Sequence, residues 1–186
     1  MFATPILESL ATEDYLAAEQ LSAIKHEYID GQVYAMAGAS DNHVTIALNL
    51  AALLKTHLRG SKCRTYISDM KVRIEELNIF YYPDVLVTCD ERDRSTSTYK
   101  RYPSVIAEVL SSSTEAFDRG DKFLDYQHIE TLTDYLLINT TRQRIDGFCR
   151  RDDGLWVMQS YAVGQTLTLP NLQFEASVEA LYEEVN

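Results

Sequence analysis

Residues 105–110 read VIAEVL, a run that is apolar at every position except Glu108. Such a continuous run is typical of a β-strand covered on both faces, whereas a half-exposed strand alternates apolar and polar residues. We therefore expect a central strand in a sheet with helices on both faces. An isolated carboxylate in such a strand costs several kcal/mol, roughly, unless it is protonated, paired or bound to a metal ion. When Glu108 is considered alone, a salt bridge or a position at the solvent-exposed end of the strand explains it equally well.

The segments before this strand show helical periodicity and one clear hairpin. Residues 13–20 are compatible with a short helix. Asp30-Gly31 stands between two β-rich runs, which is a strong signal for a two-residue hairpin. Residues 41–58 carry an apolar stripe with helical spacing, made of Ala47, Leu50, Ala51, Leu54 and Leu58.

The rest of the chain completes an alternation of helices and strands. We expect strands over 63–74, 79–88 and 105–110, a helix over 115–129, a strand over 133–139, a hairpin around residues 152–154 and a short helix over 177–185. The order helix, three strands, helix, strand predicts an α/β (α+β) fold with a mixed central sheet, helices on its faces and flanking β-hairpins. No linker interrupts the chain, so residues 1–186 are expected to form one domain.

The charge of the chain bears on its partners. The net charge is −11, which argues against nucleic acid, because phosphate contacts need Lys and Arg. The distribution softens this objection. Residues 1–31 and 175–186 together hold ten of the 28 acids but one of the 17 bases. The middle of the chain is therefore nearly neutral and has room for a local basic face.

Cysteine usage and hydropathy bear on the compartment. The three cysteines, Cys63, Cys89 and Cys149, are widely spaced and form no C-x-x-C pair. We expect buried thiols rather than a disulfide or a zinc site. No stretch approaches 18 consecutive apolar residues, and the first residues lack the pattern of a secretion signal. These observations predict a cytoplasmic protein with no membrane span.

A second carboxylate gives Glu108 a possible partner. Asp84 follows a proline in YYPDVLVT, at the expected start of a strand. Alone it is best explained as a residue that caps a turn. Two carboxylates on neighbouring strands repel one another, however, so the pair favours a bound cation. Oxygen ligands suit magnesium or manganese, and such a metal ion could support phosphodiester hydrolysis.

Lys122 is the candidate cation of the same site. It lies in DRGDKFLDY, on the helix expected after Glu108. In isolation it is a solvated lysine that pairs with Asp118 one helical turn earlier. In the functional interpretation its ammonium reaches back to the two carboxylates, where it would orient water or stabilise charge on the phosphate.

Several motifs in order resemble the Uma2 family of the PD-(D/E)XK nuclease superfamily. They are HEYIDGQVYAMAGAS, the helix with His43, YYPDVLVTCD, P-x-x-IAEVLS-x-ST and DRGDKFLDYQ. The resemblance covers roughly residues 12–185. It implies a restriction-endonuclease-like core of order α-β-β-β-α-β, which agrees with the element order read from the periodicity.

The resemblance also assigns roles to residues. Pro83-Asp84 matches the PD element, and Glu108 matches the acidic residue of the (D/E)-x-K element. The lysine of that element would stand two residues later, where this sequence has Leu110. Family members of this kind carry the lysine on the following helix, and Lys122 is the matching candidate.

Three further residues have open roles. Glu27 in HEYIDG resembles an acidic residue that adds a third carboxylate, but an exposed hairpin glutamate would look the same. His43 is either a core histidine on the apolar stripe or a catalytic residue. Tyr126, one turn after Lys122, either orients the lysine or packs in the core.

The implied function is a magnesium-dependent (or manganese-dependent) DNA endonuclease. Asp84 and Glu108 would hold the metal, and Lys122 would assist the attacking water. The alternative is a catalytically inactive regulatory or protein-binding module that keeps the nuclease fold. Hydrolysis of RNA or a nucleotide is a third possibility. By analogy with nucleases of this fold, a homodimer is possible.

Overall fold

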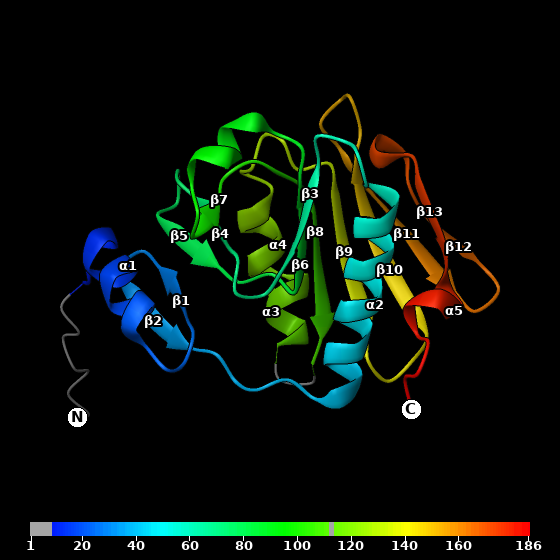
Figure 1. The fold of residues 1–186 in the computed structure, drawn as a ribbon, viewed down its shortest axis with the longest axis horizontal. Helices are drawn as coiled ribbons and strands as arrows, with labels where there is room; N and C mark the ends of the chain where they lie inside the picture. Colours follow the sequence, from blue (N-terminus) through cyan, green and yellow to red (C-terminus); the bar gives the residue numbers. More distant parts are fainter. Residues whose placement is uncertain (1–8, 112–113) are drawn as a thin grey trace.

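A six-stranded mixed sheet forms the centre of the protein, which we describe from a computed structural model over residues 9–111 and 114–186 (Figure 1). Its strand order is β11-β10-β9-β8-β6-β3. The strands are β3 (Arg64–Ile67), β6 (Val85–Thr88), β8 (Pro103–Leu110), β9 (Asp134–Asn139), β10 (Arg144–Arg150) and β11 (Trp156–Ala162). β8 and β9 are parallel, and the other neighbours are antiparallel.

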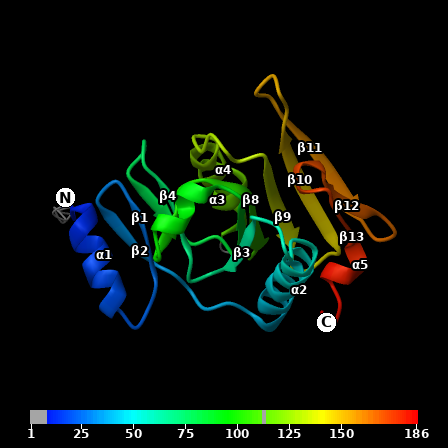
Figure 2. The same ribbon diagram turned by 45° about the horizontal axis from the view of Figure 1, so that its top comes forward.

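The central strand β8 is covered on both faces, as its sequence predicts. Val105, Ala107 and Val109 pack with α2 (Asp41–His57), α5 (Val178–Leu181) and the hairpin β12 (Thr166–Leu169)–β13 (Phe174–Ser177). Ile106 and Leu110 point to the other face, toward α3 (Glu115–Arg119) and α4 (Asp121–Tyr126). Figure 2 shows α2 on one side of β8 and α3 with α4 on the other. The order α2, β3, β6, β8, α3–α4, β9 is the predicted α-β-β-β-α-β core.

A second sheet lies against the face that carries α3 and α4. Its order is β2-β1-β5-β4-β7, and its strands are β1 (His26–Ile29), β2 (Gln32–Ala35), β4 (Lys71–Ile74), β5 (Ile79–Tyr81) and β7 (Tyr99–Lys100). The helix α1 (Thr12–Leu21) covers its outer face through Tyr15, which packs on Tyr28 and Phe80. Val72, Ile74, Ile79 and Tyr81 of this sheet share one apolar cluster with Leu86 and Ile106 of the larger sheet.

The two strands expected over 63–74 and 79–88 are each divided in two, so this expectation was wrong. Ser68–Met70 and Tyr82–Asp84 interrupt them, and the halves enter different sheets: β3 and β6 stay in the larger sheet, while β4 and β5 join the smaller one. Pro83 has no backbone N–H for a ladder, which explains the second break. The first break is a turn in which Asp69 and Met70 donate to the Ile67 carbonyl.

Other local expectations were met more closely. Asp30 and Gly31 have φ of 43° and 88° and form the tight turn between β1 and β2, as a two-residue hairpin requires. Ser40 caps α2 by accepting from the His43 amide. The helix expected over 115–129 ends at Tyr126 and is split at Gly120 into α3 and α4. The described residues include no helix that is both long and apolar enough to span a bilayer.

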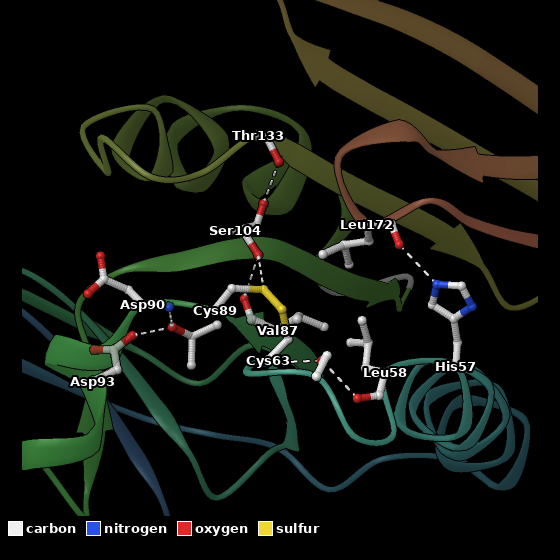
Figure 3. The surroundings of a disulfide bond; sticks show 12 residues. His57, Leu58, Cys63, Val87, Cys89, Asp90, Asp93, Ser104, Thr133 and Leu172 are labelled. Carbon is white, nitrogen blue, oxygen red and sulfur yellow. Dashed lines mark hydrogen bonds between the residues drawn. A yellow bond between two sulfur atoms is a disulfide. The ribbon is translucent and has the colours of Figure 1, made fainter.

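The expectation of three free thiols was wrong. Cys63 and Cys89 form a disulfide (Figure 3), and Cys149 is the free cysteine. The two cysteines are 26 residues apart, but they flank β3 and β6, where Arg64 pairs with Thr88. The antiparallel register therefore places Cys63 opposite Cys89. The sequence alone does not show this register, so the spacing of the cysteines did not reveal the pair.

The disulfide predicts a redox-dependent stability. In the chain-entropy account, a cross-link that closes a loop of this size stabilises the fold by roughly 3.5 kcal/mol. We expect a reductant to lower the urea midpoint of the wild type but to leave the midpoint of the Cys63→Ser/Cys89→Ser variant unchanged. Cys149→Ser is the matched control and should respond to reductant as the wild type does. Titration of three reactive thiols in air-oxidised, unfolded protein would contradict the assignment.

Candidate active site

Asp84 and Glu108 come together because their strands are neighbours. Val85 of β6 pairs with Ala107 of β8 in antiparallel register. One step further, Asp84 stands opposite Glu108, so the two side chains share one end of the sheet. Asp84 Oδ2 accepts the Val109 amide at 2.7 Å, which holds the carboxylate against β8. Glu108 is 3% exposed, which agrees with the buried position that its apolar neighbours predict.

Lys122 reaches this pair from α4. Its Nζ lies 3.0 Å from Glu108 Oε1 and 3.1 Å from Glu27 Oε1. Asp118 Oδ1 lies 3.6 Å from the same ammonium, so the helical pair that the sequence suggested is also present. The side chain of Lys122 is 6% exposed. The lysine is therefore a buried cation between three carboxylates and not a solvated surface residue.

Glu27 enters the site from the smaller sheet. It lies on β1, and its Oε1 also accepts the Tyr82 amide at 3.3 Å. Its side chain is 15% exposed, so it is not an exposed hairpin glutamate. Because Tyr82 precedes Pro83-Asp84, this bond connects Glu27 to the segment that carries the first carboxylate.

His43 contacts the other side of Asp84. It lies in the first turn of α2, and its Nε2 is 2.8 Å from Asp84 Oδ1. Both side chains are 16% exposed. The histidine is therefore neither fully buried nor free: it restrains the orientation of the Asp84 carboxylate.

Tyr126 binds the glutamate and not the lysine. Its hydroxyl donates to Glu108 Oε1 at 3.0 Å. The neighbouring Tyr81 donates to Asp125 Oδ2 at 2.6 Å, and the Lys122 ammonium lies 5.2 Å from the centre of its ring. Both tyrosines are fully buried. They form a rigid apolar wall with polar ends around the ion pair.

The electrostatics of the cluster follow from an excess of negative charge. Burial raises the pKa of Glu108 well above its usual value; Lys122 opposes this effect, and Asp118, Asp84 and Glu27 add to it. Burial also raises the pKa of Asp118. For Lys122, burial acts to lower the pKa, but Glu108, Glu27 and Asp118 outweigh it and raise the pKa. The lysine is thus held protonated. Its single positive charge does not compensate all the neighbouring carboxylates, so the pKa values of Glu108 and Asp118 stay raised.

The five residues selected from the sequence lie together in one region of the fold. His43 contacts Asp84, Asp84 lies opposite Glu108, and Lys122 joins Glu108 to Glu27. Leu110, which occupies the usual lysine position, is buried in the apolar cluster with Tyr126. The amine of Lys122 takes the place beside Glu108 from a different element, so the departure at Leu110 does not leave Glu108 without a cation.

Asp118 is a member of the cluster that sequence reasoning missed. It was considered there only as a surface partner of Lys122, yet it is 3% exposed. The spacing of the two residues could have indicated this position, because a residue one turn before a buried lysine lies on the same helical face and is expected to be buried with it. This inference requires that Lys122 is buried, which the sequence alone does not show.

The raised pKa of Glu108 predicts a pH-dependent stability. A carboxyl group whose pKa is higher in the folded state than in the unfolded state stabilises the fold below about pH 4.5, its ordinary pKa, and loses this contribution as pH rises through the folded pKa. We expect the free energy of unfolding of the wild type, relative to Glu108→Gln, to fall from acidic to neutral pH. The slope is at most about 1.4 kcal/mol per pH unit. Urea unfolding of both proteins over this range is the measurement, and a constant difference would contradict it.

Comparisons with known proteins agree with this fold. A family model described as "Uma2: Putative restriction endonuclease" matches residues 12–179. The Synechocystis protein slr1290 is 43% identical over 173 residues, which cover 93% of this chain and 91% of the relative. A second Synechocystis protein, sll1609, is 36% identical over 152 residues, which cover 80% of this chain and 85% of the relative.

A solved structure shows the same architecture. It is a crystal structure described as "a putative nuclease belonging to DUF820" from Anabaena variabilis, with a TM-score of 0.76, 13% sequence identity, and coverage of 94% of this chain and 98% of that chain. This similarity concerns the fold alone. The family model matches most of the sequence, and the chain therefore belongs to the Uma2 family.

Proposed function

We propose that the protein is a divalent-metal-dependent DNA endonuclease that uses Asp84, Glu108 and Lys122. The observation that supports it most is an excess of negative charge: the carboxylates of Glu108, Glu27 and Asp118 surround the buried Lys122 ammonium, and Asp84 adds a fourth carboxylate that acts electrostatically on Glu108. One cation does not neutralise this group, so it favours a second one. The family description as a restriction endonuclease supports nucleic acid as the substrate.

The donor set fits a hard divalent cation. Asp84 and Glu108 offer oxygen ligands on neighbouring strands, and oxygen ligands suit magnesium or manganese. Lys122 and Tyr126 both bind Oε1 of Glu108, so Oε2 is the oxygen best placed to serve as a ligand. Over residues 9–111 and 114–186, no three His, Cys, Asp or Glu side chains could hold a metal by themselves. The fit therefore concerns a pair, and magnesium commonly uses one or two protein carboxylates beside water and phosphate.

A bound magnesium or manganese ion would supply Lewis-acid polarisation of the phosphate and a more acidic water. The protein contributes orientation and charge. His43 and the Val109 amide hold the two oxygens of Asp84, and Tyr126 positions Glu108. Lys122 stays protonated among its carboxylates. Its ammonium would hold the attacking water or offset negative charge that develops on the phosphate.

The first test is cleavage of plasmid and single-stranded DNA with magnesium or manganese. We expect Asp84→Asn and Glu108→Gln to lower the cleavage rate by roughly a hundredfold or more, because each removes a charge that the reaction needs at a fixed place. Glu76→Gln is the matched control, since Glu76 is 73% exposed and pairs with the exposed His128. Equal rates for the wild type and Asp84→Asn would refute the proposal.

The second test measures the cation without requiring activity. Because the pKa of Glu108 is raised, cation binding must displace a proton, and affinity should increase with pH. We expect magnesium or manganese to raise the unfolding temperature more at mildly alkaline than at mildly acidic pH, and Asp84→Asn to lose most of the increase. A cation at about 100 times its Kd adds about 2.7 kcal/mol.

The non-catalytic module remains the second candidate. The observation that favours it is the engagement of Lys122 by three carboxylates, which leaves this ammonium less free for a water molecule. The cation titration separates the two functions. A wild type that neither metal stabilises at any pH would favour the binding module over the nuclease.

A further inference from the structure

A second polar cluster lies in line with the candidate active site. Glu108 of β8 pairs with Leu137 of β9, Leu137 with Asp146 of β10, and Asp146 with Ser160 of β11. Directly paired residues point to the same face of a sheet, and neighbouring strands lie about 4.8 Å apart. Asp146 therefore lies on the face of Glu108, two strands away, at about 10 Å.

Asp146 organises two arginines. Arg119 Nη1 donates to Asp146 Oδ2 at 2.9 Å, and Arg144 Nε donates to Oδ1 at 2.9 Å. Ser160 donates to the same Oδ1 at 2.6 Å. The Asp146 side chain is 4% exposed, whereas the arginines are 35% and 50% exposed. A buried carboxylate thus fixes two guanidinium groups that still face solvent.

The carboxylate is an anion and leaves the arginines partly free. Burial acts to raise the pKa of Asp146, but the bonds from Ser160, Arg144 and Arg119 lower it below its usual value. An arginine carries five N–H donors. Arg119 uses two groups on Asp146 and Glu115, and Arg144 uses two on Asp146 and Ser160. In the contacts among residues 9–111 and 114–186, N–H donors on both side chains remain for a further anion.

A third arginine extends this surface toward the site. Arg142 lies in the turn between β9 and β10, and Thr140 of this turn donates to the Leu110 carbonyl at 3.0 Å. The turn is therefore fastened to the end of β8, two residues beyond Glu108. In Figure 1 this turn and the end of β8 lie along the lower edge of the molecule. Arg142 is exposed, and in the described part of the chain its guanidinium forms no ion pair.

These positions match the needs of a phosphate-binding surface. The guanidinium group binds phosphate through paired N–H donors. The three arginines carry three positive charges, and Asp146 and the half-exposed Glu115 carry two negative ones. This surface therefore has a net charge of +1, although the net charge of the whole chain is −11. A DNA duplex carries about six phosphates over 10 Å of its axis. A DNA strand with one phosphate at Glu108 would therefore place neighbouring phosphates within reach of the arginines.

We infer that Arg119, Arg142 and Arg144 form a contact surface for the phosphate backbone of DNA and hold it beside the candidate active site. This inference rests on the proposed nuclease function and adds the residues that bind the substrate. Asp146 and Ser160 act as positioning residues, because they orient the arginines and would not touch the nucleic acid. Arg119 has a second task, since its bond to Asp146 also fastens α3 to the sheet.

The test is the binding of a fluorescently labelled DNA duplex, followed by anisotropy in EDTA over a range of salt concentrations. Arg142→Gln and Arg142→Gln/Arg144→Gln are the variants, because neither removes the bond between Arg119 and Asp146. We expect several-fold weaker binding for each arginine removed. The slope of log K against log salt should decrease in magnitude by about 1 per arginine. Arg94→Gln is the matched control, since Arg94 is 49% exposed on the 3-10 helix Glu91–Ser95, which follows the end of β6 opposite to Asp84.

Thermal unfolding of each variant separates lost contacts from lost folding. Unchanged affinity and salt slope in the folded double variant would overturn the inference, as would a wild type that does not bind the duplex. Cleavage assays distinguish this failure from failure of the proposed function. Arginine-dependent binding without cleavage in either metal would refute the nuclease and leave the surface standing. Cleavage with an unchanged KM and salt slope in the double variant would refute the surface alone.

Discussion

The ammonium of Lys122 holds together parts of the protein that the chain keeps apart. It contacts Glu108 of the larger sheet, Glu27 of the smaller sheet and Asp118 of the preceding helix. Removal of one partner from a buried ion cluster leaves charges without compensation, which costs about 3–5 kcal/mol. The ion pairs of Lys122 therefore connect the two sheets and also form the centre of the candidate site.

The same cluster carries an electrostatic cost that the surrounding packing offsets. Three carboxylates around one ammonium, with Asp84 as a further negative charge beside Glu108, are not the most stable arrangement, and the pKa values of Glu108 and Asp118 are raised as a result. The apolar packing of β8 against α2 on one face and against Tyr126 on the other supports the strand that carries Glu108. A well-packed core thus offsets an unfavourable electrostatic arrangement, as is common where charged groups are kept for function.

The antiparallel pairing of β6 places the disulfide and a residue of the candidate site at opposite ends of one strand. Cys89 follows β6 and is joined to Cys63, while Asp84 precedes β6 and stands opposite Glu108. The disulfide restrains β3 against β6, and the Val109 amide fixes Asp84 against β8. Rigid support of this kind on both sides of a strand suits a site that depends on the spacing of two carboxylates.

The sequence by itself determined the local elements and the chemical character of the site. The apolar run around Glu108 predicted a strand that is covered on both faces, and Asp30-Gly31 predicted the hairpin. The motifs around Asp84, Glu108 and Lys122 predicted which side chains form the candidate site. These features depend on residue type and short-range periodicity, which a sequence displays directly. The tertiary structure alone decided which strands belong to which sheet, that Cys63 faces Cys89, that Glu27 and Asp118 join the cluster, and that Asp146 lies in line with Glu108. Each of these depends on strand register or on the packing of distant elements, and a shift of one residue in the pairing of a strand would turn its side chains to the opposite face.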